Sequence, residues 1–265
     1  MNTNSNTYTV IYSTILVVVV AAVLAFAAMY LKPKQDENVK KDTISQILTA
    51  AEIETNEGSD ILQIYADSID VAILVKMDGT IADTLNTTAK ECVVYGTSEL
   101  KAQTVAKDAD KKLPVYIFKN GITVIPCYGA GLWGPIWGYI GLDDDLNTIK
   151  KACFGHKGET PGLGAKITDE PAVFADNFAD KKIGSGEVFF TVAKNVTDDN
   201  LNAVNAISGA TITSQSVGKA VNQWFGFYQE YFKKYGVKAE CEQPEAQDAP
   251  EAEAETETPA EPVNE

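Results

Sequence analysis

The sequence predicts an α+β protein with one N-terminal membrane helix, a single α+β domain and a disordered acidic tail. Three observations predict this organisation. The first 31 residues carry no charged side chain and end in the apolar run Val10 to Leu31. Residues 61–238 alternate short β-favouring runs with turn signals and close with a long amphipathic pattern. Residues 239–265 contain ten acids and no base, and so account for ten of the fifteen net negative charges.

The run Val10 to Leu31 is long enough to cross a bilayer as one helix. Tyr8, Tyr12 and Tyr30 lie near its ends, where membrane helices carry aromatic residues. A cleaved signal peptide, with Ala25-Phe26-Ala27 as its cleavage site, is the alternative. Such peptides usually have a basic start and a shorter apolar core, so we predict an uncleaved anchor.

We divide the chain into an N-terminal segment 1–9, a transmembrane helix 10–31, a juxtamembrane linker 32–60, a domain 61–238 and a tail 239–265. In the linker, Ile44, Ile47, Leu48 and Ile53 have helical spacing, and a turn follows at 56–59. The tail is a low-complexity mixture of Glu, Ala, Pro and Thr that cannot bury a core.

Within the domain, the expected strands begin with Val71–Val75, which an Asp78-Gly79 turn follows. Asn120-Gly121 separates two β-favouring runs, 115–118 and 122–125, and this pattern predicts a hairpin. Further strands are expected at Trp137–Leu142 and Val188–Val192, and a short helix at 174–178. The last helix is expected over 214–235, with an apolar stripe formed by Val217, Val221, Trp224, Phe225, Tyr228, Tyr231 and Phe232.

Composition excludes several functions. All 22 basic residues are lysine, and without arginine or a basic patch nucleic-acid binding is not expected. His156 is the only histidine and the four cysteines form no CxxC pair, which argues against a structural zinc or iron–sulfur site. Asp143, Asp145 and Asn147 imitate a calcium loop that lacks its glycine and its final glutamate, so we predict a solvated turn there.

Gly129 to Gly134 matches the dinucleotide pattern GxGxxG letter for letter. That motif requires a helix to start inside it, so that the helix N-terminus faces the pyrophosphate. Here Pro135 and an aromatic, β-favouring stretch follow instead. We therefore predict a tight glycine-permitted bend or a ligand wall.

Residues 208–214 combine four hydroxyls with two small residues, Gly209 and Ala210, directly before the long helix. The N-terminus of that helix favours an anion such as phosphate, and we expect Thr213 or Ser214 to cap it. On residue types alone, a plain loop with a helix cap is the simpler interpretation.

A second segment, 156–164, contains a His-Lys pair, a Thr-Pro turn and three glycines. Dense glycine beside polar groups lets a backbone approach a flat ligand. Trp133, Trp137 and Tyr139 can supply aromatic walls, although a surface loop with core aromatics has the same pattern.

Together these segments resemble a known family. Ser208–Thr211 reads Ser-Gly-Ala-Thr, which resembles the motif of FMN-binding domains whose flavin is attached through its phosphate to the last threonine. The anchor helix, Leu31–Asn38, Gly131–Tyr139, Glu159–Gly164 and Ser208–Thr211 are, in this order, similar to the C subunit of the Na⁺-translocating NADH:quinone reductase. The resemblance covers roughly residues 10–237. The G subunit of the Rnf ferredoxin:NAD⁺ complex shares the last two segments, whereas Gly-Leu-Trp and Lys-Pro-x-Gln favour the C subunit of the reductase.

The resemblance implies that Thr211 carries a covalent FMN as a phosphoester, installed from FAD by a separate flavin transferase in the presence of Mg²⁺. No residue of the chain is then catalytic. Ser208 and Thr213 are expected to bond the phosphate, and His156 or Lys157 to stabilise the reduced flavin. Asn205 stands where the family often has an acid, which predicts that flavinylation is slower or needs its own partner enzyme. The remaining implied FMN-binding residues are Gly209, Ala210, Glu159, Thr160, Leu163 and Trp133, of which Trp133 and the Glu159–Leu163 turn are expected to line the ring.

The role implied is an electron relay within a membrane oxidoreductase and translocase. Electrons pass from iron–sulfur centres of the complex to the FMN of its B subunit, while other subunits move sodium and reduce quinone. One uncharged span cannot itself be the sodium path. The family places the domain on the periplasmic side of the inner membrane, whereas the lysines after the span favour the cytoplasm. We follow the family, because large domains translocate largely regardless of charge.

Two alternatives differ in function. One is the Rnf-type relay with the same cofactor chemistry. The other is a membrane-anchored binding module without a cofactor, in which residues 208–214 are only a helix start. An anchored hydrolase would need an activated nucleophile, and the sequence shows no nucleophile elbow or triad pattern.

Overall fold

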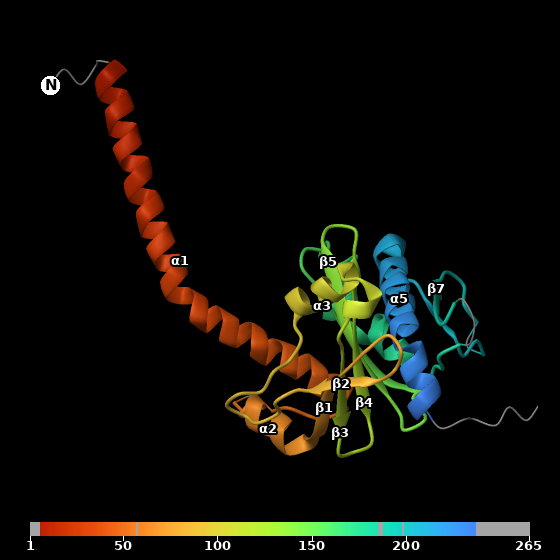
Figure 1. The fold of residues 1–265 in the computed structure, drawn as a ribbon. Helices are drawn as coiled ribbons and strands as arrows, with labels where there is room; N and C mark the ends of the chain where they lie inside the picture. The colour runs from red at the N-terminus through yellow and green to blue at the C-terminus, as the bar shows by residue number, and fades with distance from the viewer. Residues whose placement is uncertain (1–5, 57, 185–187, 198, 237–265) are drawn as a thin grey trace, which may run out of the picture.

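The computed structural model describes residues 6–56, 58–184, 188–197 and 199–236 of the chain. A long N-terminal helix projects from an α+β domain built on a six-stranded sheet (Figure 1). The predicted fold class, an apolar N-terminal helix followed by one α+β domain, is confirmed. The predicted disordered tail lies outside the described residues.

The main sheet has the order β2-β1-β3-β4-β5-β6, and each neighbouring pair is antiparallel. A second, parallel pair joins β7 to β8. The strands are β1 (Ile69–Val75), β2 (Ile81–Thr84), β3 (Leu113–Phe118), β4 (Thr123–Ala130), β5 (Pro135–Leu142), β6 (Ile149–His156), β7 (Thr191–Ala193) and β8 (Ala203–Asn205). The α-helices are α1 (Asn6–Ala50), α2 (Ile61–Ser68), α3 (Thr97–Val105), α4 (Lys166–Asp169) and α5 (Thr211–Tyr235), with 3₁₀ turns η1 (Asp108–Asp110), η2 (Pro171–Val173) and η3 (Ala175–Phe178).

The predicted Asn120-Gly121 hairpin turn is present, and the predicted glycine bend at 129–134 is a turn between two further strands. Gly121 has φ of 88° in the turn that joins β3 to β4, a conformation that favours glycine. Residues 131–134 form the turn between β4 and β5, where the Gly131 N–H donates to the Gly134 carbonyl over 2.8 Å. The GxGxxG pattern is therefore a hairpin bend, as its following proline and aromatic residues indicated.

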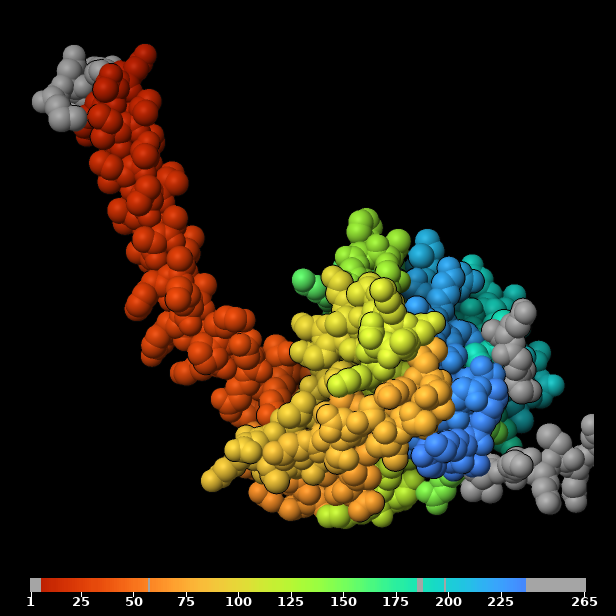
Figure 2. All heavy atoms as spheres, viewed as in Figure 1, coloured from red at the N-terminus to blue at the C-terminus, as the bar shows by residue number. Residues whose placement is uncertain are grey.

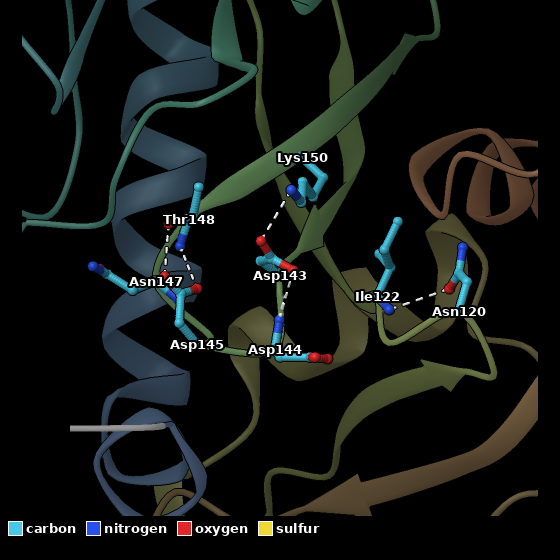
Figure 3. Close-up of polar contacts among 8 residues, drawn as sticks. All are labelled: Asn120, Ile122, Asp143, Asp144, Asp145, Asn147, Thr148 and Lys150. Atoms are coloured by element: carbon cyan, nitrogen blue, oxygen red, sulfur yellow. Dashed lines mark hydrogen bonds and ion pairs between the residues drawn. The ribbon is translucent and has the colours of Figure 1, made fainter. Parts of the chain in front are cut away.

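The calcium-like segment is a turn between β5 and β6 whose carboxylates bond their own backbone (Figure 3). Asp145 accepts from the N–H groups of Asn147 and Thr148 over 2.8 and 2.7 Å. Asp143 pairs with Lys150 at 3.0 Å. Partial burial alone would raise the pKa of Asp145, but the hydrogen bonds from Thr148 and Asn147 leave it below its ordinary value.

Two strand predictions need correction. β6 was not predicted, although it is the partner of β5 along its whole length. The expected strand Val188–Val192 is shorter and shifted: the strand is Thr191–Ala193, so only Thr191 and Val192 of the prediction belong to it. The backbone N–H groups of Phe189 and Phe190 donate instead to the Asn222 side chain on α5, at 2.7 and 2.9 Å.

Helix α5 fixes the site because it packs along β4 with its predicted apolar stripe. Trp224 is fully buried and its indole N–H donates to the Tyr128 carbonyl over 2.9 Å. The hydroxyl of Tyr228 donates to the Pro114 carbonyl on β3 over 2.6 Å. The helix is thus bonded to two strands, and its N-terminal turn has a defined place relative to the sheet.

Helix α1 joins the apolar segment to the domain without a break. Its N-terminal part stands clear of the domain (Figure 2) and is apolar enough to cross a membrane, with a mean hydropathy of 2.7. Pro33 lies inside the helix, which bends partway along its length (Figure 1). At the other end Ile44, Ile47 and Leu48 are fully buried in the domain core. The juxtamembrane part of the chain therefore contributes to the core.

Candidate functional site

Three segments that are distant in the sequence meet at one end of the domain. They are the β4–β5 bend at 131–134, the loop 159–164 after β6, and residues 207–213 at the start of α5. β6 runs antiparallel to β5 and pairs His156 with Ile136, so the chain leaves β6 beside that bend. The register of β5 and β6 therefore places the loop 159–164 next to the bend at 131–134.

The carboxylate of Glu159 links all three segments. One oxygen, Oε1, accepts the backbone N–H of Trp133 over 3.0 Å, and the other, Oε2, accepts the hydroxyl of Thr213 over 2.7 Å. Glu159 is 4% exposed and Thr213 is 1% exposed. Both were predicted to contact a ligand, but in this structure each binds the other.

Glycines let the backbone close around this carboxylate. A Cβ added at Gly131 would come within 2.5 Å of Oε1 of Glu159. One added at Gly164 would come within 2.6 Å of Oε2 and 2.8 Å of the Thr213 hydroxyl oxygen. Gly131 and Gly164 thus allow the packing of a buried side chain, one from each of the two glycine-containing segments.

We expect Gly164→Ala to destabilise the domain by about 1–3 kcal/mol, because its Cβ would press against both partners of a buried hydrogen bond. Gly158→Ala is the matched control: its Cβ would meet only the Trp133 carbonyl oxygen at 3.7 Å, an ordinary contact. Urea denaturation followed by circular dichroism measures both. Equal unfolding free energies for the two variants would contradict the packing described.

Residues 207–210 form a tight turn in front of α5. The Ala210 N–H donates to the Ile207 carbonyl over 3.0 Å, and Gly209 has φ of 81°, as a type II turn requires at this position. The Ser214 hydroxyl accepts from the Ile207 N–H over 3.0 Å and donates to the Ala210 carbonyl over 2.9 Å. The turn is therefore tied to the first turn of the helix.

The predicted helix cap is wrong. α5 begins at Thr211 and its N-cap, Ala210, makes no side-chain cap bond; among the residues that the structure describes, no side chain bonds the N–H groups of the first turn. Thr213 and Ser214 lie inside that turn with their hydroxyls engaged by Glu159 and Ile207. An uncapped helix start with free N–H groups suits an oxyanion, and Ser208 and the partly exposed Thr211 lie beside it.

Apolar side chains form an exposed rim around this helix start. They come from all three segments: Leu132, Trp133, Leu163 and Ile212 are 47%, 67%, 45% and 60% exposed. Leu163 lies against Gly209, whose added Cβ would be 3.1 Å from its Cδ2. Trp133 and Leu163, both predicted site residues, are thus placed to contact a flat ligand.

The remaining predicted residues differ in exposure and in hydrogen bonding. Thr160 and Lys157 are exposed. His156 accepts the Glu159 N–H at Nδ1 over 3.2 Å, which leaves only its other ring nitrogen for a ligand. Asn205 bonds both the N–H and the carbonyl of Val196, over 2.8 and 3.0 Å. An acid at position 205 would lose the second of these bonds, so the asparagine has a local structural role.

A cleft of about 460 Å³ lies on a different part of the domain, between α3 and the β4–β5 hairpin. A neighbouring cleft of about 430 Å³ extends toward α1. Lys157 and Trp137, which the sequence also suggested as ligand contacts, line the second cleft, but neither lining contains Glu159 or any residue of 207–213. The candidate site is accordingly the exposed rim and helix start, at the end of the domain.

Comparison with known proteins gives consistent matches. The model of the family "FMN-binding domain" matches residues 131–226, a span that contains all three segments. The C subunit of the Na⁺-translocating NADH-quinone reductase of Haemophilus ducreyi is 29% identical, over 89% of this chain and 95% of the relative.

Two solved structures are similar. The crystal structure of the Shewanella oneidensis protein NqrC has 25% identity and a TM-score of 0.59, over 75% of this chain and 98% of that one. The C subunit of the Na⁺-translocating NADH-quinone reductase of Parabacteroides distasonis has 33% identity and a TM-score of 0.62, over 76% of this chain and 96% of that one. The chain therefore belongs to the family of C subunits of the Na⁺-translocating NADH-quinone reductases.

Proposed function

We propose that this chain is the electron-carrying C subunit of a membrane Na⁺-translocating NADH:quinone oxidoreductase and that FMN is attached to Thr211 by a phosphoester. The observation that carries the proposal is the start of α5: an uncapped helix N-terminus, a partly exposed threonine and a glycine turn, all inside the region that matches the FMN-binding family. When bound, FMN supplies reversible uptake and release of electrons.

The residues present fit the phosphate of FMN. Free N–H groups of the first turn of α5 can bond its oxygens, and the helix dipole favours its charge. Ser208 is exposed and adds a hydroxyl donor. The chain has no arginine that could bind a phosphate dianion bidentately. An ester bond to Thr211 removes one negative charge from the phosphate, so less positive charge is needed to hold it. Thr213 supports this site through Glu159, because its hydroxyl points into the protein.

Attachment requires a flavin transferase, FAD and Mg²⁺. The Oγ1 of Thr211 forms a bond to the FMN-side phosphorus of FAD, and the bond from that phosphorus to the oxygen of AMP breaks. The hydroxyl proton is lost and AMP leaves, so the reaction needs no oxidant or reductant. Thr211 is the first residue of α5 and is partly exposed, which is compatible with access by another enzyme.

In the complex, the exposed apolar side chains of Leu132, Trp133, Leu163 and Ile212 would line the flavin ring and would leave it open to the subunits that give and accept electrons. We infer that these groups are an iron–sulfur centre and the FMN of the B subunit, with the domain on the periplasmic side of the inner membrane. The one helix long and apolar enough to cross a membrane among the described residues carries no charged side chain between Asn6 and Leu31, so we infer that sodium passes through other subunits.

The test is the mass of the full-length chain produced with a flavin transferase and denatured before measurement. We expect an increase of one FMN less one water, yellow in-gel fluorescence, and the added mass on the peptide that contains Thr211. An unmodified, non-fluorescent chain, produced with a transferase that labels a control substrate, would contradict the proposal and favour a binding module without a cofactor.

A further inference from the structure

Glu159 is the one buried acidic side chain among the residues that the structure describes. A buried carboxylate is costly unless donors compensate it, and here one donor comes from the β4–β5 bend and the other from α5. Because both carboxylate oxygens are bonded within the protein, neither is directed at the exposed rim. Its place at the meeting point of three segments therefore calls for a role other than ligand contact.

The first turn of α5 depends on this carboxylate. Helix starts without a capping side chain fray, and α5 has none. Two side-chain bonds hold the turn instead: Ser214 ties it to Ile207, and Thr213 ties it to Glu159. Thr213 is the third residue of the helix, in the same turn as Thr211. The Glu159 bond is thus the one that fixes this turn to the sheet side of the site.

We propose that Glu159 is a positioning residue that acts through Thr213. Its carboxylate holds the first turn of α5 so that the Thr211 hydroxyl and the free N–H groups face outward together, ready for the phosphate. The inference rests on the proposed attachment of FMN to Thr211. It differs from a contact role because Glu159 and Thr213 then act as one unit and touch neither FMN nor FAD.

The experiment is a double-mutant cycle on the full-length chain in detergent, supplied with flavin transferase, FAD and Mg²⁺. The initial rate of covalent labelling is read from flavin fluorescence of the denatured chain. Thr213→Val removes the hydroxyl at nearly constant shape. We expect it to slow labelling on the order of tenfold, because the Thr211 hydroxyl would no longer be held in position to attack the phosphorus of FAD. In a Glu159→Ala background the same change should have less than about a twofold effect, since the shared bond is already absent. Thr213→Ser should restore the wild-type rate.

Hydrogen exchange on the chain without FMN supplies a second readout. Peptides that cover the start of α5 should exchange faster in Thr213→Val and Glu159→Ala than in the wild type, while the β3–β4 region is unchanged. Asn222→Ala is the matched control for lost stability: it removes bonds to Phe189 and Phe190 about three turns further along α5. This variant should unfold more easily yet be labelled at the wild-type rate.

Several results would overturn the inference. Equal slowing by Thr213→Val in both backgrounds means that Thr213 contacts the phosphate directly. Wild-type labelling of Thr213→Val, or unchanged exchange at the start of α5, means that the bond does not position the turn. If Glu159→Ala does not fold, the inference is judged from the labelling rates and hydrogen exchange of Thr213→Val and Thr213→Ser alone. If the wild type itself is not labelled, the proposed function fails, and the exchange measurement still judges the positioning role.

Discussion

Thr211→Ala is expected to leave the chain folded and free of covalent FMN. Thr211 is the first residue of α5 and only partly buried, so removal of its hydroxyl and methyl costs little packing. Its Oγ1 is, in our proposal, the only atom that bonds the phosphorus. After co-production with the transferase, this variant should therefore show the mass of the unmodified chain and only background fluorescence in the gel.

Two variants identify the atom. Thr211→Ser keeps a hydroxyl and should be labelled, and Ser208→Ala removes a neighbouring hydroxyl and should also be labelled. Residual covalent flavin in Thr211→Ala, lost on combination with Ser208→Ala, would show that Ser208 is the acceptor. Melting temperatures near that of the wild type exclude unfolding as the cause of any loss.

The second large effect is on stability. Trp224→Ala is expected to lower the free energy of unfolding by about 4 kcal/mol, as for other fully buried large aromatics. The indole fills the space between α5 and β4, and its N–H bonds the Tyr128 carbonyl. Since domains of this size are stable by only about 5–15 kcal/mol, this loss would be a large fraction of the total free energy of unfolding. Urea denaturation followed by circular dichroism measures the change.

Trp224→Phe separates packing from the hydrogen bond. It retains an aromatic ring and should cost about 1–3 kcal/mol, mainly because the Tyr128 carbonyl, in a partly buried position, loses its donor. Gln223→Ala, on the exposed neighbouring position, should be close to neutral. If Trp224→Ala were as stable as Gln223→Ala, the contact between α5 and β4 described above would be incorrect.

Local signals in the sequence predicted the parts of the fold that depend on neighbouring residues. Asn120-Gly121 predicted a hairpin because few other residues adopt its turn, and Pro135 excluded a helix after Gly134. β6 escaped prediction because Lys150, Lys151 and Gly155 interrupt its apolar alternation; the strand is defined by its pairing with β5.

The site was predicted as segments rather than as contacts. The motifs located all three loops, but the bond between Glu159 and Thr213 spans 54 positions and follows only from the sheet register and the packing of α5. Without that contact, Thr213 resembles a helix cap or a phosphate donor. The structure assigns its hydroxyl to a buried partner, and the free N–H groups of the first turn remain for an anion.

The continuous helix α1 has a geometric consequence for assembly. Its residues run from the apolar span into the domain core without a loop. A rotation of the span about its own axis would therefore rotate the domain with it and change the direction in which Thr211 faces. One residue inserted between the span and Thr43 would turn the domain by about 100° and lift it by about 1.5 Å, whereas seven would nearly restore the original facing about 10 Å further away. The span thus anchors the domain and also sets its orientation and its distance from the membrane.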